Sequence, residues 1–255
     1  MACSRKPNCH HPSRGFHFKQ NSSCSVIAQN IDSIKQRIRE ICAGCGRNPD
    51  EIRLVAVTKT HPEEKILEAR QAGLSEFGEN RVQELVPKMD RLPSDIVWHM
   101  VGTVQTNKIK DMVHRVDWIH SISKIKYLRE LEKRASRIDR LIRVLIQVNI
   151  SDEDQKSGCN VRELPAILEY AADLKHVSVH GLMGMASFTD DRDLVRRQFT
   201  ALRQYRDEHL SYETDNVQLR ELSMGMSGDY DIAIEEGATI IRLGSTIFGT
   251  RSSDQ

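Results

Sequence analysis

The sequence predicts an α/β fold, a single (β/α)8 barrel of the TIM type with one extra helix at its N-terminal side. Eight short apolar segments alternate with helical segments between Leu54 and Leu243. The apolar segments are continuous runs, which is typical of parallel strands covered by helices. Eight strand–helix units in series favour a closed barrel, because open doubly wound sheets usually contain about five or six strands. An open α/β sheet is the alternative.

The extra helix is predicted over about Val26 to Cys45, before the first strand. Isoleucines recur there at steps of four and three and form one apolar stripe. They are Ile27, Ile31, Ile34, Ile38 and Ile41. The stripe is too short for a coiled coil, which needs at least about three heptads. We therefore expect this helix to pack on the outside or the base of the barrel.

The barrel elements follow in order along the chain. The first strand, 54–58, is apolar and β-branched, and the helix after it, 62–72, begins at Pro62 and is closed by Gly73. The apolar run 141–149 is the strongest strand signal. The other strands are predicted at 76–78, 96–101, 118–121, 177–182, 219–223 and 239–243. The other helices are predicted at 80–89, 105–114, 125–137, 161–174, 194–209 and 230–236.

Composition excludes several classes of protein. The 37 basic and 36 acidic residues nearly cancel, whereas nucleic acid and anionic membranes favour a strong basic excess. No apolar run approaches the ~20 residues that span a bilayer. Six scattered cysteines fit a reducing compartment, and we expect a cytoplasmic protein that acts as a monomer, without nucleic-acid or membrane partners.

Residues 1–24 differ in composition from the rest of the chain. They contain no Asp or Glu and no continuous apolar segment, so they do not form a secretory signal. They are predicted to be a disordered basic tail, with a weak organelle transit peptide as the alternative. Residues 25–251 are predicted to form the barrel domain.

Two loops at the end of the barrel sequence predict a phosphate site. Phosphate sites of such barrels are typically built from the loops after strands seven and eight. Here these loops are the Gly- and Ser-rich segments 223–229 and 242–246. Their backbone N–H groups can approach an anion closely, and Gly244 and Ser245 begin the turn into the last helix. Either loop alone would be read as a tight turn, but the pair at these strands favours phosphate binding.

Lys59 is the second anchor of the predicted site. It follows the first apolar strand directly, so it is expected at the barrel mouth, where desolvation lowers the pKa of an amine and frees it for attack on an aldehyde. Alone it would be read as a salt-bridged or snorkelling lysine. Together with a phosphate site it indicates pyridoxal 5′-phosphate (PLP), or a phosphosugar held by a Schiff-base aldolase. Spacing alone does not separate these two.

Two histidines and several methionines are interpreted as structural residues rather than metal ligands. His99 and His120 lie on or beside predicted strands and are expected to be hydrogen-bonded structural residues rather than metal ligands. The methionines near the mouth are expected to pack there rather than bind a soft metal. They are Met183, Met185, Met224 and Met226.

The motifs between Ile27 and Arg251 resemble, in order, those of the pyridoxal phosphate homeostasis proteins, whose barrel is similar to the N-terminal domain of alanine racemase. The lysine motif is Leu54-Val-Ala-Val-Thr-Lys-Thr-His-Pro62. The supporting motifs are Phe77-Gly-Glu-Asn80, Trp98-His-Met-Val-Gly102, Gly181-Leu-Met-Gly-Met185, Ser223-Met-Gly-Met-Ser227-Gly-Asp229 and Arg242-Leu-Gly-Ser-Thr-Ile-Phe-Gly249. The resemblance selects PLP over a phosphosugar.

The resemblance implies a role for each of eight residues. Lys59 would form the Schiff base, and Arg242 would face the pyridine nitrogen. Asn80 would contact the cofactor ring. The phosphate contacts would be Ser227, Gly244 and Ser245, with Ser223 and Met226 lining the same cradle. The chain departs from the family at Arg81, where an aromatic residue is usual, and this change is expected to affect access to the mouth or contacts with partners without removing the Schiff base.

The expected function is PLP homeostasis, the holding and delivery of the cofactor without amino-acid chemistry. A cation at Arg242 disfavours protonation of the ring nitrogen and makes the ring a weak electron sink. The related racemases add a second domain that supplies a catalytic tyrosine, and we expect none here, because the sequence ends shortly after Gly249. A racemase-like enzyme is the alternative, and an aldolase a weaker one. Apo PLP-dependent enzymes are the expected recipients.

Overall fold

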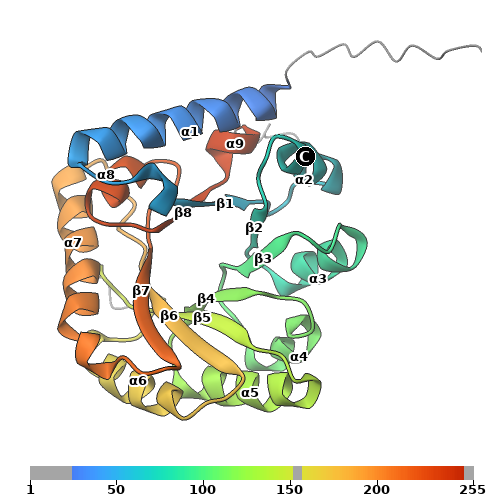
Figure 1. The fold of residues 1–255 in the computed structure, drawn as a ribbon, viewed down its shortest axis with the longest axis vertical. Helices are drawn as coiled ribbons and strands as arrows, with labels where there is room; N and C mark the ends of the chain where they lie inside the picture. The colour runs from blue at the N-terminus through green and yellow to red at the C-terminus, as the bar shows by residue number, and fades with distance from the viewer. Residues whose placement is uncertain (1–24, 152–156, 250–255) are drawn as a thin grey trace, which may run out of the picture.

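The computed structural model describes residues 25–151 and 157–249, and within them eight parallel strands close into one barrel (Figure 1). Each strand pairs with the next in sequence, and the first pairs with the last. The strands are β1 (Arg53–Val57), β2 (Glu76–Glu79), β3 (Val97–Met100), β4 (Trp118–Ile122), β5 (Ile142–Gln147), β6 (Val177–Met183), β7 (Val217–Ser223) and β8 (Ile240–Leu243). The predicted (β/α)8 barrel is confirmed, and the open-sheet alternative is wrong.

Helices form the outer ring of the barrel (Figure 1). The α-helices are α1 (Val26–Cys45), α2 (Glu63–Gln71), α3 (Val82–Arg91), α4 (Ile109–Met112), α5 (Ile125–Ala135), α6 (Leu164–Ala172), α7 (Arg192–Glu208), α8 (Tyr230–Glu235) and α9 (Ser245–Phe248). The helix predicted over 105–114 is instead a 3-10 turn, Thr106–Lys108, followed by the short α4. Thr106 and Val113 are β-branched and lower the helix propensity of this segment at both ends. The predicted tail, 1–24, lies outside the described residues.

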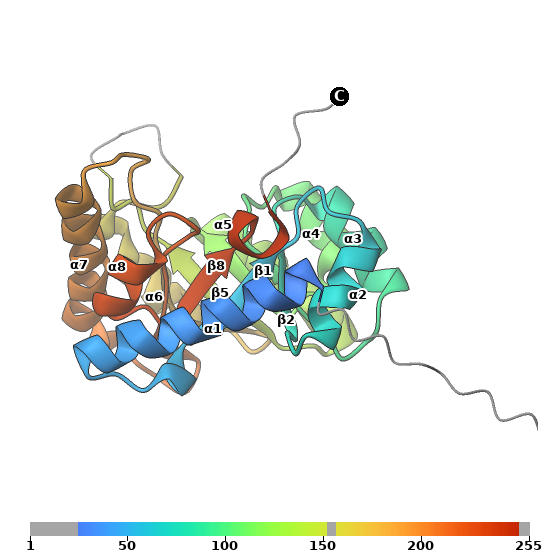
Figure 2. The same ribbon diagram turned by 90° about the horizontal axis from the view of Figure 1, so that it is seen from above.

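Helix α1 lies across the outside of the barrel, against α2, α8 and α9 (Figures 1 and 2). Its five stripe isoleucines are all buried, as expected for a helix packed on a barrel. Ser25 caps its first turn by accepting the Ala28 N–H at 3.1 Å. Asn30 Nδ2 donates to the Ile247 carbonyl at 2.9 Å and so joins α1 to α9. The extra helix therefore covers the seam where β8 meets β1.

Shortening one isoleucine of this stripe tests its contribution to stability. Ile31 is fully buried, so Ile31→Val should lower the free energy of unfolding by about 0.5–1.5 kcal/mol, through lost burial and a small cavity. Val26 on the same helix is 71% exposed, so Val26→Ala should change stability by less than about 0.5 kcal/mol. Urea denaturation of both variants measures the difference, and equal effects would contradict the packing described for α1.

Two apolar clusters fill the molecule. The larger lies between the strands and the surrounding helices. The smaller lies inside the barrel and is made by Val55, Trp118, Leu145, Met183 and Ile240. None of the helices in the described ranges is long and apolar enough to cross a bilayer.

Candidate functional site

A cavity of about 1040 Å³ opens at the C-terminal ends of the strands. Seven of the eight site residues predicted from the sequence line it, namely Lys59, Asn80, Met226, Ser227, Arg242, Gly244 and Ser245. The eighth, Ser223, does not. The volume is slightly above the ~300–1,000 Å³ range of small-molecule sites. The location agrees with the position of functional sites in barrels of this class.

Lys59 follows β1 and lies in a tight turn on the cavity wall. The His61 N–H donates to the Thr58 carbonyl at 3.0 Å, and the Thr60 N–H donates to the Glu84 carboxylate at 2.7 Å. Thr60 has a φ of 65°, so the chain reverses sharply beside the lysine. The Lys59 side chain is exposed. The expectation that burial desolvates its amine is therefore wrong, because the lysine lies beyond the end of the strand at the open rim.

A buried ion pair supports the Lys59 turn from below. Lys88 Nζ, from α3, donates to Glu79 Oε1 at 2.5 Å and to the Thr58 carbonyl at 2.9 Å. Thr58 Oγ1 donates to the same carboxylate at 2.6 Å. Burial raises the pKa of Glu79, although hydrogen bonds from Lys88 and Thr58 act in the opposite direction. The residue before Lys59 is thus held by both β2 and α3.

Asn80 and Arg81 line the cavity immediately after β2. Gly102 follows β3 and packs against the backbone of this loop. A Cβ atom on Gly102 would lie 2.1 Å from the Asn80 carbonyl oxygen, so only glycine allows the two loops to approach this closely. The Arg81 side chain is exposed at the mouth, as the sequence predicted.

The loops after β7 and β8 bring small polar groups to the cavity. The residues that line it there are Met226, Ser227, Gly228, Asp229, Gly244 and Ser245. Helix α9 begins at Ser245, and its Ile247 and Phe248 N–H groups donate to the Gly244 carbonyl at 3.0 Å. The N–H groups of Ser245 and Thr246 have no acceptor within the helix. The two serine hydroxyls and these N–H groups form a donor set that suits an anion.

Asp229 shapes the loop after β7. Its Oδ1 accepts the Met226 N–H at 2.6 Å, which closes the turn around Ser227. Burial raises the pKa of the Asp229 carboxyl, while the Met226 N–H and the Arg242 charge act against that rise. The sequence contained Asp229 within a motif but gave no reason to assign it a role, because its loop contact depends on the turn geometry.

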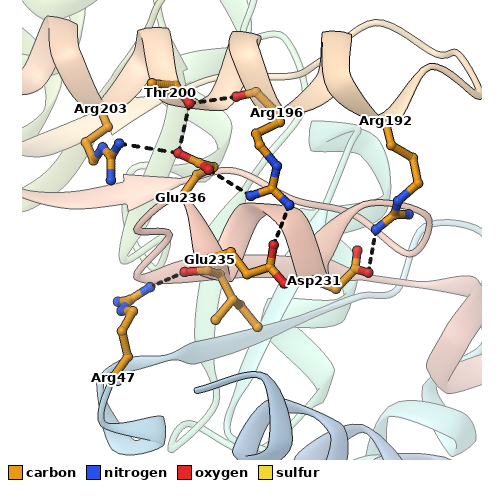
Figure 3. A network of polar contacts seen from close by, with 9 residues as sticks. Arg47, Arg192, Arg196, Thr200, Arg203, Asp231, Glu235 and Glu236 are labelled. Atoms are coloured by element: carbon orange, nitrogen blue, oxygen red, sulfur yellow. Dashed lines mark hydrogen bonds and ion pairs between the residues drawn. The ribbon is translucent and has the colours of Figure 1, made fainter. Parts of the chain in front are cut away.

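Helix α8 continues from this loop and is held on two sides (Figure 3). From α7, Arg196 contacts Glu235 at 2.5 Å and Glu236 at 2.8 Å. From the segment after α1, Arg47 Nη1 donates to the Ile234 carbonyl at 2.7 Å. Further contacts between α7 and α8 are Arg192–Asp231, Arg203–Glu236 and Thr200–Glu236. Each exposed pair contributes little alone, but the network fixes the helix that carries the serine loop.

Arg242 is the buried cation of the site, with only 4% of its surface exposed. Its Nη1 donates to the Ser223 carbonyl at 2.8 Å and to Ser223 Oγ at 2.5 Å, and its Nη2 donates to the Gly184 carbonyl at 3.2 Å. Burial lowers the pKa of Arg242 to about 10, with Asp229 opposing the shift, so the guanidinium stays charged at neutral pH. Ser223 is not on the cavity wall; its hydroxyl lies inside the barrel, where it accepts from Arg242.

His99 and His120 lie inside the barrel and are fully buried. His120 Nδ1 is 2.9 Å from Ser223 Oγ, and His120 Nε2 is 2.9 Å from His99 Nδ1. The expectation that both are hydrogen-bonded is confirmed. Their connection to Arg242 through Ser223 could not be read from the sequence, since these residues come from four strands, β3, β4, β7 and β8.

Further residues of the cavity wall have no assignment from the sequence. Gln147 is the last residue of β5, and its Nε2 donates to the Ser157 carbonyl at 3.0 Å. The rule that barrel sites gather at strand ends could have identified Gln147. Others on the wall are His61, Thr103, Phe188, Asp190 and Arg192. Most of these lie on loops, where position does not follow from strand periodicity.

The barrel, together with an amine, two serine loops and a buried guanidinium at its mouth, defines a class of protein. The family model described as alanine racemase, N-terminal domain, matches residues 29–252. Alanine racemase from Corynebacterium glutamicum shares the fold, with a TM-score of 0.65 and 16% identity, over 90% of this chain and 62% of that one. At this identity the likeness concerns the fold alone.

Proteins with higher sequence identity to this chain indicate its family within this fold class. The pyridoxal phosphate homeostasis protein of Aquifex aeolicus is 40% identical over 224 residues, which cover 88% of this chain and 97% of that protein. The protein of the same name from Escherichia coli K12 is 37% identical and is covered to 97% of its length. PipY of Synechococcus elongatus, in a structure with PLP bound, has a TM-score of 0.77 and 33% identity, over 88% of this chain and 100% of that one. The chain belongs to the pyridoxal phosphate homeostasis protein family.

Proposed function

We propose that this protein binds PLP as a Schiff base of Lys59 and serves PLP homeostasis, by holding the cofactor and passing it to apo enzymes that need it. The observation that carries the proposal is one exposed lysine amine in the same cavity as two serine loops and the buried Arg242. The names of the relatives and the PLP in the PipY structure support the same cofactor. The protein is expected to act as a monomer.

The groups on the cavity wall fit PLP in kind and number. PLP supplies an aldehyde, a phosphate monoester and a pyridine ring with a basic nitrogen. Lys59 offers the amine for the aldehyde, and Ser227, Ser245 and the first N–H groups of α9 offer donors for the phosphate. Arg242 has five N–H donors, of which three are used by Ser223 and Gly184, so two remain for the cavity. Asn80 and Met226 complete the wall.

The charge on Arg242 argues for a carrier rather than an amino-acid enzyme. A guanidinium that is cationic at neutral pH disfavours a second positive charge on a nitrogen beside it. A ring without that proton withdraws electrons weakly. A racemase also needs an acid or base on each face of its planar intermediate. All five tyrosines belong to the described residues, and none of them lines the cavity.

The experiment that tests the function combines binding and turnover. PLP is titrated into the purified protein, and a stoichiometric visible absorbance that borohydride reduction makes permanent is expected. The loaded protein is then incubated with single enantiomers of several amino acids, and no sustained racemisation is expected. Sustained turnover would replace the carrier proposal by the racemase alternative. Binding of a phosphosugar in place of PLP would favour the aldolase.

The two serine loops give a separate prediction for PLP affinity. Ser227→Ala and Ser245→Ala should each weaken PLP binding by about tenfold or more, because a hydrogen bond to a charged group contributes roughly 1.5–3 kcal/mol. Ser136→Ala is the matched control, since Ser136 is exposed and outside the cavity. Absorbance titration measures each dissociation constant. Unchanged affinity in both loop variants would place the phosphate elsewhere.

A further inference from the structure

A line of polar side chains crosses the interior of the barrel below the candidate site. It starts at Arg242 on β8 and continues through Ser223 at the end of β7 to His120 on β4 and His99 on β3. It ends at Glu76, the first residue of β2, whose Oε2 is 3.2 Å from His99 Nε2. The line therefore joins the mouth of the barrel to its opposite end.

The position of each hydrogen atom follows from the Arg242 end of the line. A guanidinium only donates, so Ser223 Oγ must accept from Arg242 Nη1. Ser223 Oγ could accept a second hydrogen bond, but its own hydrogen would then have no acceptor among the described residues. The hydroxyl hydrogen therefore points to His120 Nδ1 at 2.9 Å. His120 Nδ1 consequently carries no hydrogen and accepts.

The second half of the line continues the same order. A neutral imidazole carries one hydrogen, so His120 carries it on Nε2 and donates to His99 Nδ1 at 2.9 Å. His99 must then carry its own hydrogen on Nε2, facing Glu76. That last contact is too bent for a full hydrogen bond, but a bare nitrogen there would set its lone pair against the carboxylate. Both histidines are thus held as the Nε2–H tautomer.

Burial keeps both imidazole rings neutral, while His99 and Arg53 keep Glu76 ionised. Burial lowers the pKa of both His99 and His120. The ionisable groups around the pair include Arg53, Glu76, Asp117 and Arg242. Burial opposes ionisation of Glu76, but the contact with His99 and the hydrogen bonds from Arg53 outweigh it and lower its pKa to about 2.

Arg53 fixes the acceptor end of the line. Its Nε and Nη2 donate to the two oxygens of Glu76 at 3.0 and 2.9 Å, a bidentate pair. A donor-only group at one end and a fixed carboxylate at the other leave one direction for the hydrogen bonds between them.

We propose that His120 and His99 are positioning residues for Arg242, and that the Glu76–Arg53 pair at the base of the barrel sets the direction of the hydrogen bonds that hold it. Ser223 occupies both Nη1 hydrogens, through its carbonyl and its hydroxyl. The Nε–H and one Nη2–H are left for the cavity. This role in presenting Arg242 to the pyridine nitrogen rests on the proposed function.

The proton arrangement is tested first, in the protein without PLP. Long-range ¹H–¹⁵N correlation spectra of ¹⁵N-labelled protein distinguish protonated from bare ring nitrogens, and the two signals are assigned by their loss in His99 and His120 variants. Both rings are expected as the neutral Nε2–H tautomer between pH 6 and 8. A protonated Nδ1 on either ring would overturn the inference, and this measurement does not depend on PLP binding.

The positioning role is tested with two substitutions of His120. His120→Asn keeps an acceptor near the position of Nδ1, whereas His120→Phe keeps the volume and removes the acceptor. His120→Phe is expected to weaken PLP binding by about tenfold and to shift the pH profile of the visible absorbance, because the Arg242 donors lose their fixed orientation. His120→Asn should restore most of both properties.

The outcomes separate this inference from the proposed function. If the wild-type protein bound no PLP, the proposed function would fail, and the positioning role with it, while the spectra would still decide the proton arrangement. If both His120 variants bound PLP equally well and their visible absorbance had the same pH profile, the positioning role would be rejected. The proposed function would stand. Thermal unfolding identifies a variant that does not fold. If His120→Phe does not fold, the test rests on His120→Asn: the wild-type pH profile of the visible absorbance supports the positioning role, and its loss contradicts it.

Discussion

Replacing Lys59 with alanine is expected to abolish covalent retention of PLP. Lys59 is the lysine that lines the cavity among the residues the structure describes, and an alanine offers no amine to the aldehyde. The purified variant should show no absorbance that borohydride makes permanent, and PLP should be lost on dialysis. Stability should change little, because the side chain is exposed and belongs to no core contact.

Two further variants sharpen this test. Lys59→Arg keeps the positive charge but removes the nucleophilic amine, so it should also fail to retain PLP covalently while it still attracts the phosphate. Lys110→Ala removes an exposed lysine on α4 outside the cavity and should behave as wild type. A Lys59→Ala protein that kept the reducible chromophore would reject the assignment of this lysine.

Replacing Lys88 with methionine is expected to cause the largest loss of stability. Glu79 is fully buried, and Lys88 is its only cationic partner among the described residues. Breaking a buried pair from one side leaves an uncompensated charge and typically costs about 3–5 kcal/mol. The Thr58 carbonyl also loses its donor, so the Lys59 turn should loosen and PLP binding should weaken. Urea denaturation at pH 7.5 measures the loss of stability.

The loss in Lys88→Met should depend on pH with a defined sign. Burial already raises the pKa of Glu79 above the ordinary 4.5, and removing Lys88 raises it further. The folded state then holds a proton that the unfolded state releases above about pH 4.5, so stability falls as pH rises through this window. The deficit should be smaller at pH 5 than at pH 7.5. Adding Glu79→Leu should recover part of it; a double variant as weak as the single one would contradict the buried-charge explanation.

The sequence predicted the order of elements well because the periodic signals were strong. The isoleucine stripe of α1 and the continuous apolar runs of β5 and β6 are local patterns, and each is present close to its predicted bounds. The predicted bounds were wrong where the length of an element depends on the elements that pack beside it. β7 begins at Val217 rather than 219, since its pairing with β6 extends to Val179, and the segment 105–114 forms little helix.

The candidate site was predictable to the extent that strand ends define it. Seven of the eight predicted residues share one cavity because the C-terminal ends of parallel strands meet at one end of a barrel. The contact of Ser223 with Arg242 inside the barrel could not be predicted, because the last residue of a strand can face inward or outward and the sequence does not fix which. The burial of Glu79 against Lys88 was missed because charged residues at a strand end and on a helix ordinarily face solvent.

The sequence by itself determined that this protein is a (β/α)8 barrel with one lysine and two serine loops at its C-terminal mouth, because periodicity and strand order are local properties of the chain. Only the tertiary structure decided how those groups are supported. Closing the barrel brings β3, β4, β7 and β8 around one interior, where Ser223 and two histidines hold Arg242. The alternation of side chains along a strand allows two registers, and barrel closure selects the one that buries these polar groups.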